Sequence, residues 1–133
     1  MLCNNMKRIL ILLIFYVSVL LSNESEFNLF INDYPIWLEI PIQTIEEDCA
    51  SGCTDGIFTL NLEPYIDDPD GDIITILDPN LISGQVQQLY VDSFFLNILP
   101  SQNFFGNIVI ELTADDGELS YSTQFILEVQ PIN

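Results

Sequence analysis

Short runs with strict alternation of apolar and other residues constrain the fold of this chain most strongly. The apolar members of three such runs are Phe58, Leu60 and Leu62, then Ile108, Ile110 and Leu112, and finally Phe125, Leu127 and Val129. Successive side chains of a β-strand point to opposite faces of a sheet, so each set faces one side, toward a core. No stretch after Glu26 shows a sustained helical period. The sequence therefore predicts an all-β fold.

Turn signals separate the predicted strands. We expect strands over residues 36–42, 57–62, 73–77, 87–91, 93–99, 107–113 and 120–130. The breaks contain Pro, which fixes φ, Gly, which accepts positive φ, and Asp or Asn, which bond their own backbone. Short strands with frequent turns over about 100 residues are typical of two-sheet sandwiches. We predict a seven-stranded antiparallel Greek-key sandwich over residues 34–130.

The charge balance excludes several classes of function. The chain has 20 Asp and Glu, 2 Lys and Arg, and no His. Lys7 and Arg8 are the two bases, so no base is available beyond them to neutralise phosphates, and nucleic-acid binding is excluded. Attraction to anionic lipid is disfavoured for the same reason. The absence of His removes His-based catalytic triads and most zinc sites.

The first 22 residues have the pattern of a secretory signal peptide. Lys7 and Arg8 precede an uncharged apolar run over 9–21, which the small residue Ser22 follows. The run is short for a membrane span, which needs about 20 apolar residues. An uncleaved signal anchor stays open as the alternative, because the cleavage motif offers a single small residue. We expect a secreted or cell-surface protein that meets the membrane only through this segment or a missing anchor.

Secretion changes the interpretation of the cysteines. Loss of Cys3 with the signal would leave Cys49 and Cys53, and an even count in an oxidising compartment favours a disulfide between them. A zinc site would need two more ligands of a kind that the chain lacks. A catalytic redox pair is the third alternative, although the spacing differs from Cys-x-x-Cys.

Half of the acids fall in three predicted turns. The clusters are Glu46, Glu47 and Asp48, then Asp67, Asp68, Asp70 and Asp72, and finally Asp115, Asp116 and Glu118. Two carboxylates about 4 Å apart repel by roughly 1 kcal/mol in water and by more near a protein surface. The clusters must therefore splay into solvent or share a cation. Oxygen ligands suit Ca²⁺. The alternative for each cluster is a solvated β-turn without a ligand.

Six short motifs follow one another between residues 32 and 133. They are Asn32-Asp33-Tyr34-Pro35, the stretch 40–48 that ends in Glu47-Asp48, the turn Asp68-Pro69-Asp70-Gly71-Asp72, the corner 99–106, the hairpin Asp116-Gly117-Glu118, and the stretch 129–133. Their order resembles that of bacterial cadherin-like tandem repeats, in which the first and last of these motifs are linkers. The resemblance covers about residues 32–133. It implies a cadherin-like or Ig-like sandwich that binds calcium and belongs to a large secreted or surface protein linked to adhesion.

The resemblance also implies a set of site residues. Its calcium ligands correspond to Glu47, Asp68, Asp70, Asp116 and Asn133, and Asp72 adds a further carboxylate to the same turn. Asn32 and Asp33 correspond to the ligands of an inter-repeat linker. The segment between Cys49 and Cys53 departs from the family pattern, because it is an insertion that can alter how Glu47 is presented.

With the signal peptide over 1–22 set aside, the resemblance divides the chain into a linker over 23–33, the sandwich over 34–130, and the start of a further linker over 131–133. We expect the sequence to be a truncated part of a longer product, in which adjacent repeats are its partners. A surface protein or a polysaccharide is a further expected partner.

The expected function is a non-enzymatic, calcium-stiffened spacer or adhesion module. The alternative is a glycan- or protein-binding sandwich without metal dependence, in which Tyr34, Trp37, Tyr90 and Tyr121 offer aromatic faces. Paired carboxylates can also hydrolyse glycosides. However, the acids of this chain lie in turns, and a shared cation would keep them ionised, so we expect no enzyme.

Overall fold

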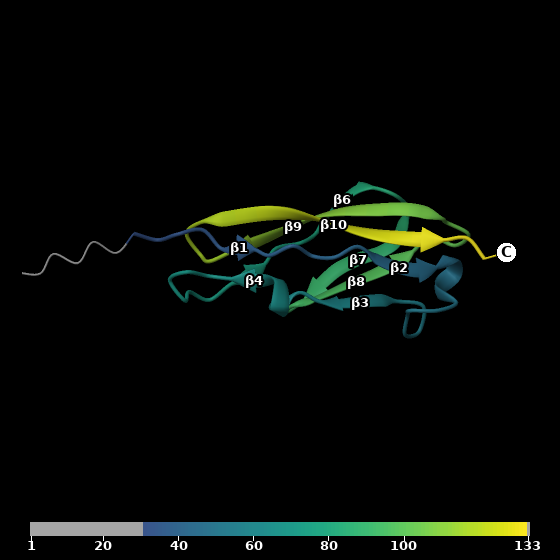
Figure 1. The fold of residues 1–133 in the computed structure, drawn as a ribbon, viewed down its shortest axis with the longest axis horizontal. Helices are drawn as coiled ribbons and strands as arrows, with labels where there is room; N and C mark the ends of the chain where they lie inside the picture. Colours follow the sequence, from purple (N-terminus) through teal and green to yellow (C-terminus); the bar gives the residue numbers. More distant parts are fainter. Residues whose placement is uncertain (1–30, 133) are drawn as a thin grey trace, which may run out of the picture. The chain divides into compact units, whose positions relative to one another are not determined.

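The computed structural model describes residues 31–132, and this part of the chain contains ten strands. They are β1 (Ile36–Trp37), β2 (Gln43–Glu46), β3 (Phe58–Asn61), β4 (Ile66–Asp67), β5 (Thr75–Ile76), β6 (Asn80–Ser83), β7 (Val86–Asp92), β8 (Phe95–Pro100), β9 (Gly106–Asp115) and β10 (Ser120–Gln130). Two 3₁₀ turns, Glu47–Cys49 and Glu63–Tyr65, complete the elements (Figure 1). Residues 31–132 contain no α-helix, so the all-β prediction is confirmed. No helix among these residues has the length and apolarity of a membrane span.

The strands pair in three sheets. The largest has the order β2-β10-β9-β5, with β6 also paired to β9; the second is β3-β8-β7; and the third is the pair β1-β4. The β9-β10 hairpin dominates the first sheet, with an unbroken antiparallel register from Ser120 opposite Asp115 to Val129 opposite Gly106. β2 joins the edge of β10 in parallel. The prediction of a wholly antiparallel sandwich was therefore wrong, and the pairing is not a simple seven-stranded Greek key.

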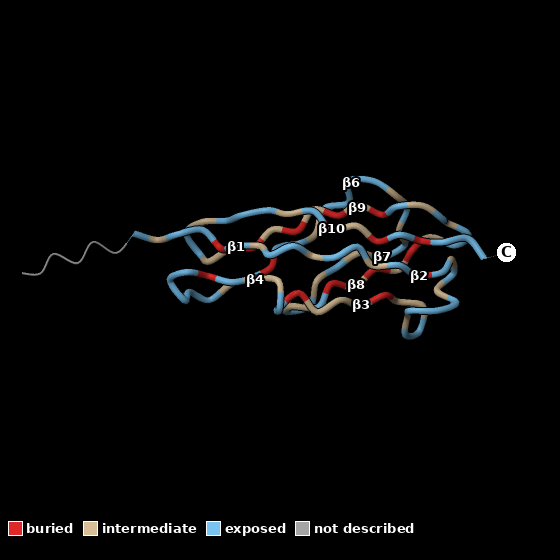
Figure 2. Tube along the Cα trace, in the orientation of Figure 1, coloured by how far each residue is buried: buried red, intermediate tan, exposed pale blue. Residues whose placement is uncertain are grey.

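One apolar core lies between the two larger sheets. Its fully buried members include Leu96 and Ile98 of β8 and Ile110 and Leu112 of β9 (Figure 2). The rings of Phe58 on β3 and Phe125 on β10 stack across the two sheets, with centroids 6.2 Å apart and ring planes 8° apart. Aromatic pairs of this kind stabilise beyond their buried area by roughly 0.5–1.5 kcal/mol. The alternation seen in the sequence thus builds the core.

The region predicted as one strand over 36–42 divides in two. Ile36 and Trp37 pair with β4, and the chain then passes Pro41, which has no N–H to donate, before β2 begins at Gln43. β6 was missed, since its four residues are all exposed and show no alternation. β4 was missed because it has two residues. Residues 1–30 and 133 lie outside the described part, and with them the predicted signal peptide and Asn133.

Candidate metal site

The turn after β4 is organised around the carboxylate of Asp68. Its Oδ1 atom accepts the backbone N–H of Asp70 at 3.0 Å and that of Asp72 at 3.1 Å. Gly71 closes the turn with φ of +78° and donates its N–H to the Asp68 carbonyl oxygen at 3.1 Å. Asp and Gly are the residues that such a turn requires, because one caps backbone donors and the other accepts positive φ.

The second oxygen of Asp68 has no partner. The side chain is 9% exposed, and Oδ2 is buried without a hydrogen bond to any residue in the described range. A buried carboxylate oxygen without a partner is destabilising, since its lost hydration is not replaced. Among residues 31–132, Asp68 is the one buried polar or charged residue, and it lies in the turn after β4 rather than in the apolar core. This oxygen is therefore placed to accept a cation.

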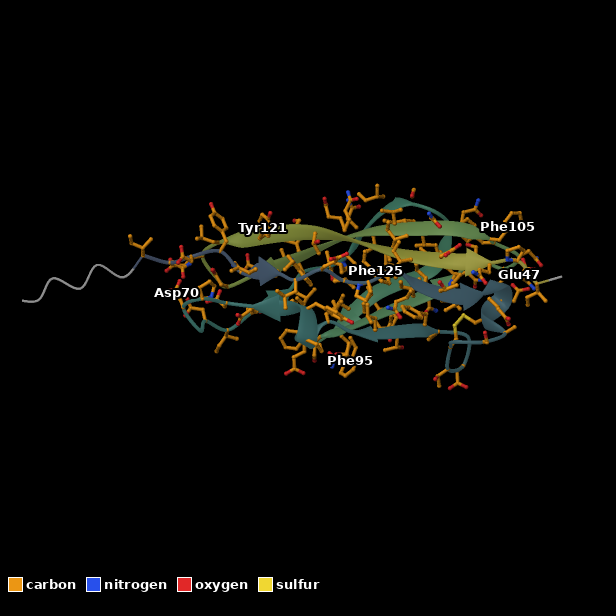
Figure 3. The ribbon with its side chains drawn as sticks, in the orientation of Figure 1. Glu47, Asp70, Phe95, Phe105, Tyr121 and Phe125 are labelled. Atoms are coloured by element: carbon orange, nitrogen blue, oxygen red, sulfur yellow. A yellow bond between two sulfur atoms is a disulfide. The ribbon has the colours of Figure 1, made fainter. Side chains whose placement is uncertain are left out.

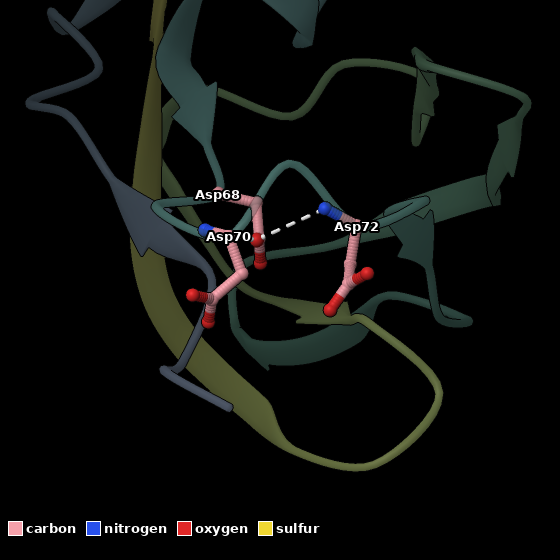
Figure 4. A group of neighbouring side chains, drawn as sticks. All are labelled: Asp68, Asp70 and Asp72. Atoms are coloured by element: carbon pink, nitrogen blue, oxygen red, sulfur yellow. Dashed lines mark hydrogen bonds between the residues drawn. The ribbon is translucent and has the colours of Figure 1, made fainter. Parts of the chain in front are cut away.

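Asp70 and Asp72 bring two more carboxylates to the same place. One oxygen of each of Asp68, Asp70 and Asp72 lies within 4.8 Å of the others. Figure 4 shows the three side chains directed to the same side of the turn. Three carboxylates at this spacing repel one another, and a divalent ion replaces that repulsion with attraction. The cluster can hold a metal ion such as Ca²⁺, which accepts oxygen ligands in a flexible geometry.

The segment that enters the sandwich contacts this cluster. The backbone N–H of Asp33 donates to Asp70 Oδ2 at 2.6 Å, and Asn32 Nδ2 donates to Asp116 Oδ2 at 3.1 Å. Because Asn32 and Asp33 are adjacent, the β9-β10 turn and the Asp68 turn lie on either side of one stretch of backbone. The structure thus brings together Asn32, Asp33, Asp68, Asp70, Asp72 and Asp116.

Asp116 is held in its ionised form by the backbone. The N–H groups of Leu119 and Glu118 both donate to its Oδ1 atom at 2.7 Å. These bonds, with a smaller contribution from Asn32, lower the pKa of Asp116 below its ordinary value, because each stabilises the carboxylate over the acid. The charge of this group is therefore available to a cation over a wider pH range.

Glu47 does not join these residues. Its Oε1 atom accepts the N–H of Ile132, which lies beyond the end of β10, whereas Asp116 lies before the start of β10. β10 has 11 residues, and a strand of that length spans roughly 35 Å. Figure 3 places Glu47 and Asp70 at opposite ends of the sandwich. One ion cannot contact both, so Glu47 belongs to a separate acidic end next to the stretch that leads to Asn133.

A disulfide and a 3₁₀ turn shape that second end. Cys49 and Cys53 are joined, with their Cα atoms 5.5 Å apart. Asp48 Oδ1 accepts the N–H of Asn103 at 2.8 Å and thereby ties the turn to the corner between β8 and β9. The loop that the sequence marked as an insertion is thus anchored directly after Glu47, by the Asp48 bond and by the disulfide.

An aromatic groove lies between β1 and the β9-β10 hairpin. It has a volume of about 620 Å³ and is lined by Tyr34, Pro35, Ile36, Trp37 and Tyr121. The Trp37 indole N–H donates to the Tyr121 carbonyl oxygen at 2.9 Å, and this bond fixes one wall. Tyr34 and Tyr121 are more than half exposed. The sequence offered these aromatic residues as candidates, but not their convergence, which depends on β1 lying beside β10.

Comparison with known proteins gives a fold and no family. No protein-family model and no curated protein matches the chain. Among solved structures, the endo-fucoidan hydrolase MfFcnA4 from glycoside hydrolase family 107 is similar over 77% of this chain, with a TM-score of 0.51 and 23% identity. A single-residue variant of the same hydrolase matches over 74%, with a TM-score of 0.50 and 21% identity.

The match covers a small part of the hydrolase. The chain spans 15% of the hydrolase in one structure and 14% in the other. At this level of identity the likeness is one of fold. The described residues thus form a β-domain that resembles a segment of a larger polysaccharide hydrolase.

Proposed function

We propose that residues 34–130 are a calcium-binding, cadherin-like repeat that acts as a stiff spacer or adhesion module in a larger secreted or surface protein. The observation that carries the proposal is the buried, unpartnered Oδ2 atom of Asp68 in a cluster with Asp70 and Asp72. The motif order and the all-β fold support the family, and the disulfide fits an oxidising, extracellular compartment.

The proposed mechanism is electrostatic and has no catalytic step. Ca²⁺ bound to Asp68, Asp70 and Asp72 offsets their mutual repulsion and fixes the turn after β4. Because Asp33 and Asn32 contact Asp70 and Asp116, the same ion restrains the segment that enters the sandwich. An entering segment with a fixed direction makes neighbouring domains of one polypeptide rigid relative to each other. Adjacent repeats are therefore the proposed partners.

Thermal unfolding with and without Ca²⁺ tests this proposal. Extracellular modules bind Ca²⁺ with Kd values of about 10⁻⁴–10⁻³ M. A ligand at 10 to 100 times its Kd stabilises the folded state by about 1.4–2.7 kcal/mol. For a domain of about 100 residues, each kcal/mol raises the Tm by roughly 4–8 °C. We expect a saturable rise of this order as Ca²⁺ is added to the purified, EDTA-treated protein.

Asp68→Asn is the decisive variant. The amide oxygen still accepts the N–H groups of Asp70 and Asp72, whereas an NH₂ group replaces the oxygen that would bind the cation. We expect the variant to fold and to lose the response to Ca²⁺. Asp92→Asn is the matched control, since it removes the same charge from an exposed position at the end of β7. An equal Ca²⁺ response in all three proteins would refute the site.

A second candidate function is glycan binding at the aromatic groove. Two observations favour it: the convergence of Tyr34, Trp37 and Tyr121, and the resemblance in fold to a segment of a polysaccharide hydrolase. Aromatic rings offer flat apolar surfaces on which the C–H face of a sugar ring can stack. The groove volume lies in the range of about 300–1,000 Å³ that small ligands occupy.

Trp37 supplies a direct test, because it is the single tryptophan of the chain. Titration with soluble polysaccharides, including fucoidan, should change its fluorescence, and Tyr121→Ala should abolish that change. Tyr90→Ala is the control, as Tyr90 is an exposed tyrosine on β7, outside the groove. Fluorescence that stays constant in every titration would exclude this candidate and leave the calcium proposal untouched.

A further inference from the structure

The outer face of the β3-β8-β7 sheet is almost free of charge. Leu96 and Ile98 of β8 point into the core, so Phe95, Asn97 and Leu99 occupy the opposite face. The strand register places five further residues on the same face, which are Thr59 and Asn61 on β3 and Gln88, Tyr90 and Asp92 on β7. Asp92, at the end of β7, is the one carboxylate among them. We call these residues, together with Phe95, Asn97 and Leu99, the neutral face.

The outer face of the other large sheet differs. Ile45, Ile110 and Val129 point into the core, and the alternate positions of these strands carry four carboxylates, which are Glu46 on β2, Glu111 and Asp115 on β9, and Glu128 on β10. The asymmetry follows from the sequence, because the 32 residues from Pro79 to Ile110 contain Asp92 as their single acid, out of 20 in the chain. The acidic residues thus lie mostly outside the neutral face of the β3-β8-β7 sheet.

Two aromatic side chains lie exposed on the neutral face. Phe95 is 48% and Tyr90 43% exposed, and they come from adjacent strands. Interface cores are depleted of charge and enriched in aromatic residues relative to the rest of a protein surface. In a chain with a formal net charge of −18, this face presents two exposed aromatic side chains beside a single carboxylate.

We propose that the neutral face is a surface through which two copies of this chain associate. Charge selects the partner. A basic partner would bind the acid-rich face and turns, where complementary charges strengthen the contact. A second copy is repelled by all of those regions, whereas the neutral face carries Asp92 as its single carboxylate, so two copies can approach there with little repulsion between carboxylates. Tyr90 and Phe95 of each copy pack against the other copy as the central anchors.

This geometry predicts an unusual salt dependence. The net charges of two copies repel at long range, and salt screens that repulsion over a Debye length that falls from about 30 Å at 0.01 M to 3 Å at 1 M. Association through the neutral face should therefore strengthen as salt is added. An interface of complementary charges would weaken under the same change.

Sedimentation equilibrium of the purified protein in EDTA tests the proposal independently of the metal. We expect a reversible dimer between micromolar and millimolar protein, with a dissociation constant that falls as NaCl rises from ~0.01 M to ~0.5 M. Phe95→Glu should raise that constant at least tenfold at the higher salt. Tyr90→Glu should act in the same direction, which guards against an effect peculiar to one position.

Phe105→Glu is the matched control. Phe105 is 62% exposed, adds the same charge when substituted, and lies near the Glu47 end, away from Phe95 (Figure 3). Its dissociation constant should stay within about twofold of the wild type. A protein that stays monomeric at every salt concentration would overturn the proposal. So would equal effects of the Phe95 and Phe105 substitutions, or a dimer that dissociates as salt is added.

Discussion

The backbone N–H of Asp33 lies 2.6 Å from a carboxylate oxygen of Asp70, 37 residues further along the chain. This bond connects the segment that enters the sandwich to the acidic turn after β4. Through it, the position of the entering segment and the state of the candidate metal site affect each other. This coupling can be measured through hydrogen exchange at the Asp33 backbone amide.

Asp70→Ala should release the Asp33 amide. Hydrogen bonds to charged groups contribute roughly 1.5–3 kcal/mol. This one is exposed, so we expect the lower end of that range, or about tenfold faster hydrogen exchange at Asp33. Exchange measured by NMR on the EDTA-treated protein reports it. Asp72→Ala is the control, because it removes a carboxylate of the same turn without touching the Asp33 bond. Equal acceleration in both variants would show that the bond does not hold the segment.

The lowered pKa of Asp116 predicts a pH-dependent contribution to stability. Since the folded-state pKa lies below that of the unfolded chain, the contribution is complete above the ordinary aspartate value of ~3.9 and is lost as pH falls through the lowered value. Asp116→Asn should therefore lower the Tm at neutral pH in EDTA. The difference from the wild type should shrink below about pH 4.

Loss of an acid also relieves general repulsion, so the Asp116 result needs a reference. Asp92→Asn serves, since its carboxylate accepts the Ser93 hydroxyl and no backbone N–H among residues 31–132. The Tm of Asp116→Asn should lie below that of Asp92→Asn at neutral pH, and the two should converge in acid. A constant gap from pH 7 to pH 2 would contradict the assigned cause.

Removal of the disulfide should affect one end of the sandwich. Crosslinks that close a loop of about five residues stabilise by roughly 2 kcal/mol in the chain-entropy account. The double variant Cys49→Ser with Cys53→Ser should lose about this much free energy of unfolding in urea. Its Tm gain with Ca²⁺ should match that of the wild type, because the disulfide lies by Glu47 and not by Asp68. Loss of the Ca²⁺ response would mean that the two ends are coupled.

The local parts of this structure could be predicted from the sequence. β10 has the predicted bounds, and the Asp68, Asp70 and Asp72 carboxylates lie together because one turn carries all three. Alternation and turn chemistry act over a few residues, so a single sequence displays them.

The contacts between distant residues could not be predicted in this way. The parallel pairing of β2 with β10 joins Ile45 to Val129, and no local pattern encodes a register across so many residues. The same limit applies to the Asp33–Asp70 bond and to the separation of Glu47 from Asp70. All three acidic turns looked alike in the sequence and suggested one kind of site. The 11 residues of β10 instead separate the Glu47 turn from the turns that contain Asp68 and Asp116.

Gly84 offers a test of how closely the loop between β6 and β7 packs against β9. A Cβ atom built on it would lie 2.8 Å from the Ile108 Cα atom and 2.9 Å from the Asn107 carbonyl oxygen, and both are backbone atoms that cannot rotate away. Gly117 has nearly the same φ, +100° against +101°, with no atom within 4 Å of the added Cβ. A side chain at either position would therefore suffer the strain of positive φ, whereas only at Gly84 would its Cβ atom also clash with the backbone of β9.

Comparison of Gly84→Ala with Gly117→Ala therefore isolates the cost of the clash. Both substitutions should destabilise by roughly 1–2 kcal/mol through the backbone, and overpacking should add about 1–3 kcal/mol at Gly84. Urea denaturation should show a lower midpoint for Gly84→Ala with a similar slope. Equal midpoints would mean that the loop between β6 and β7 can move away from β9 and make room for a Cβ atom at position 84.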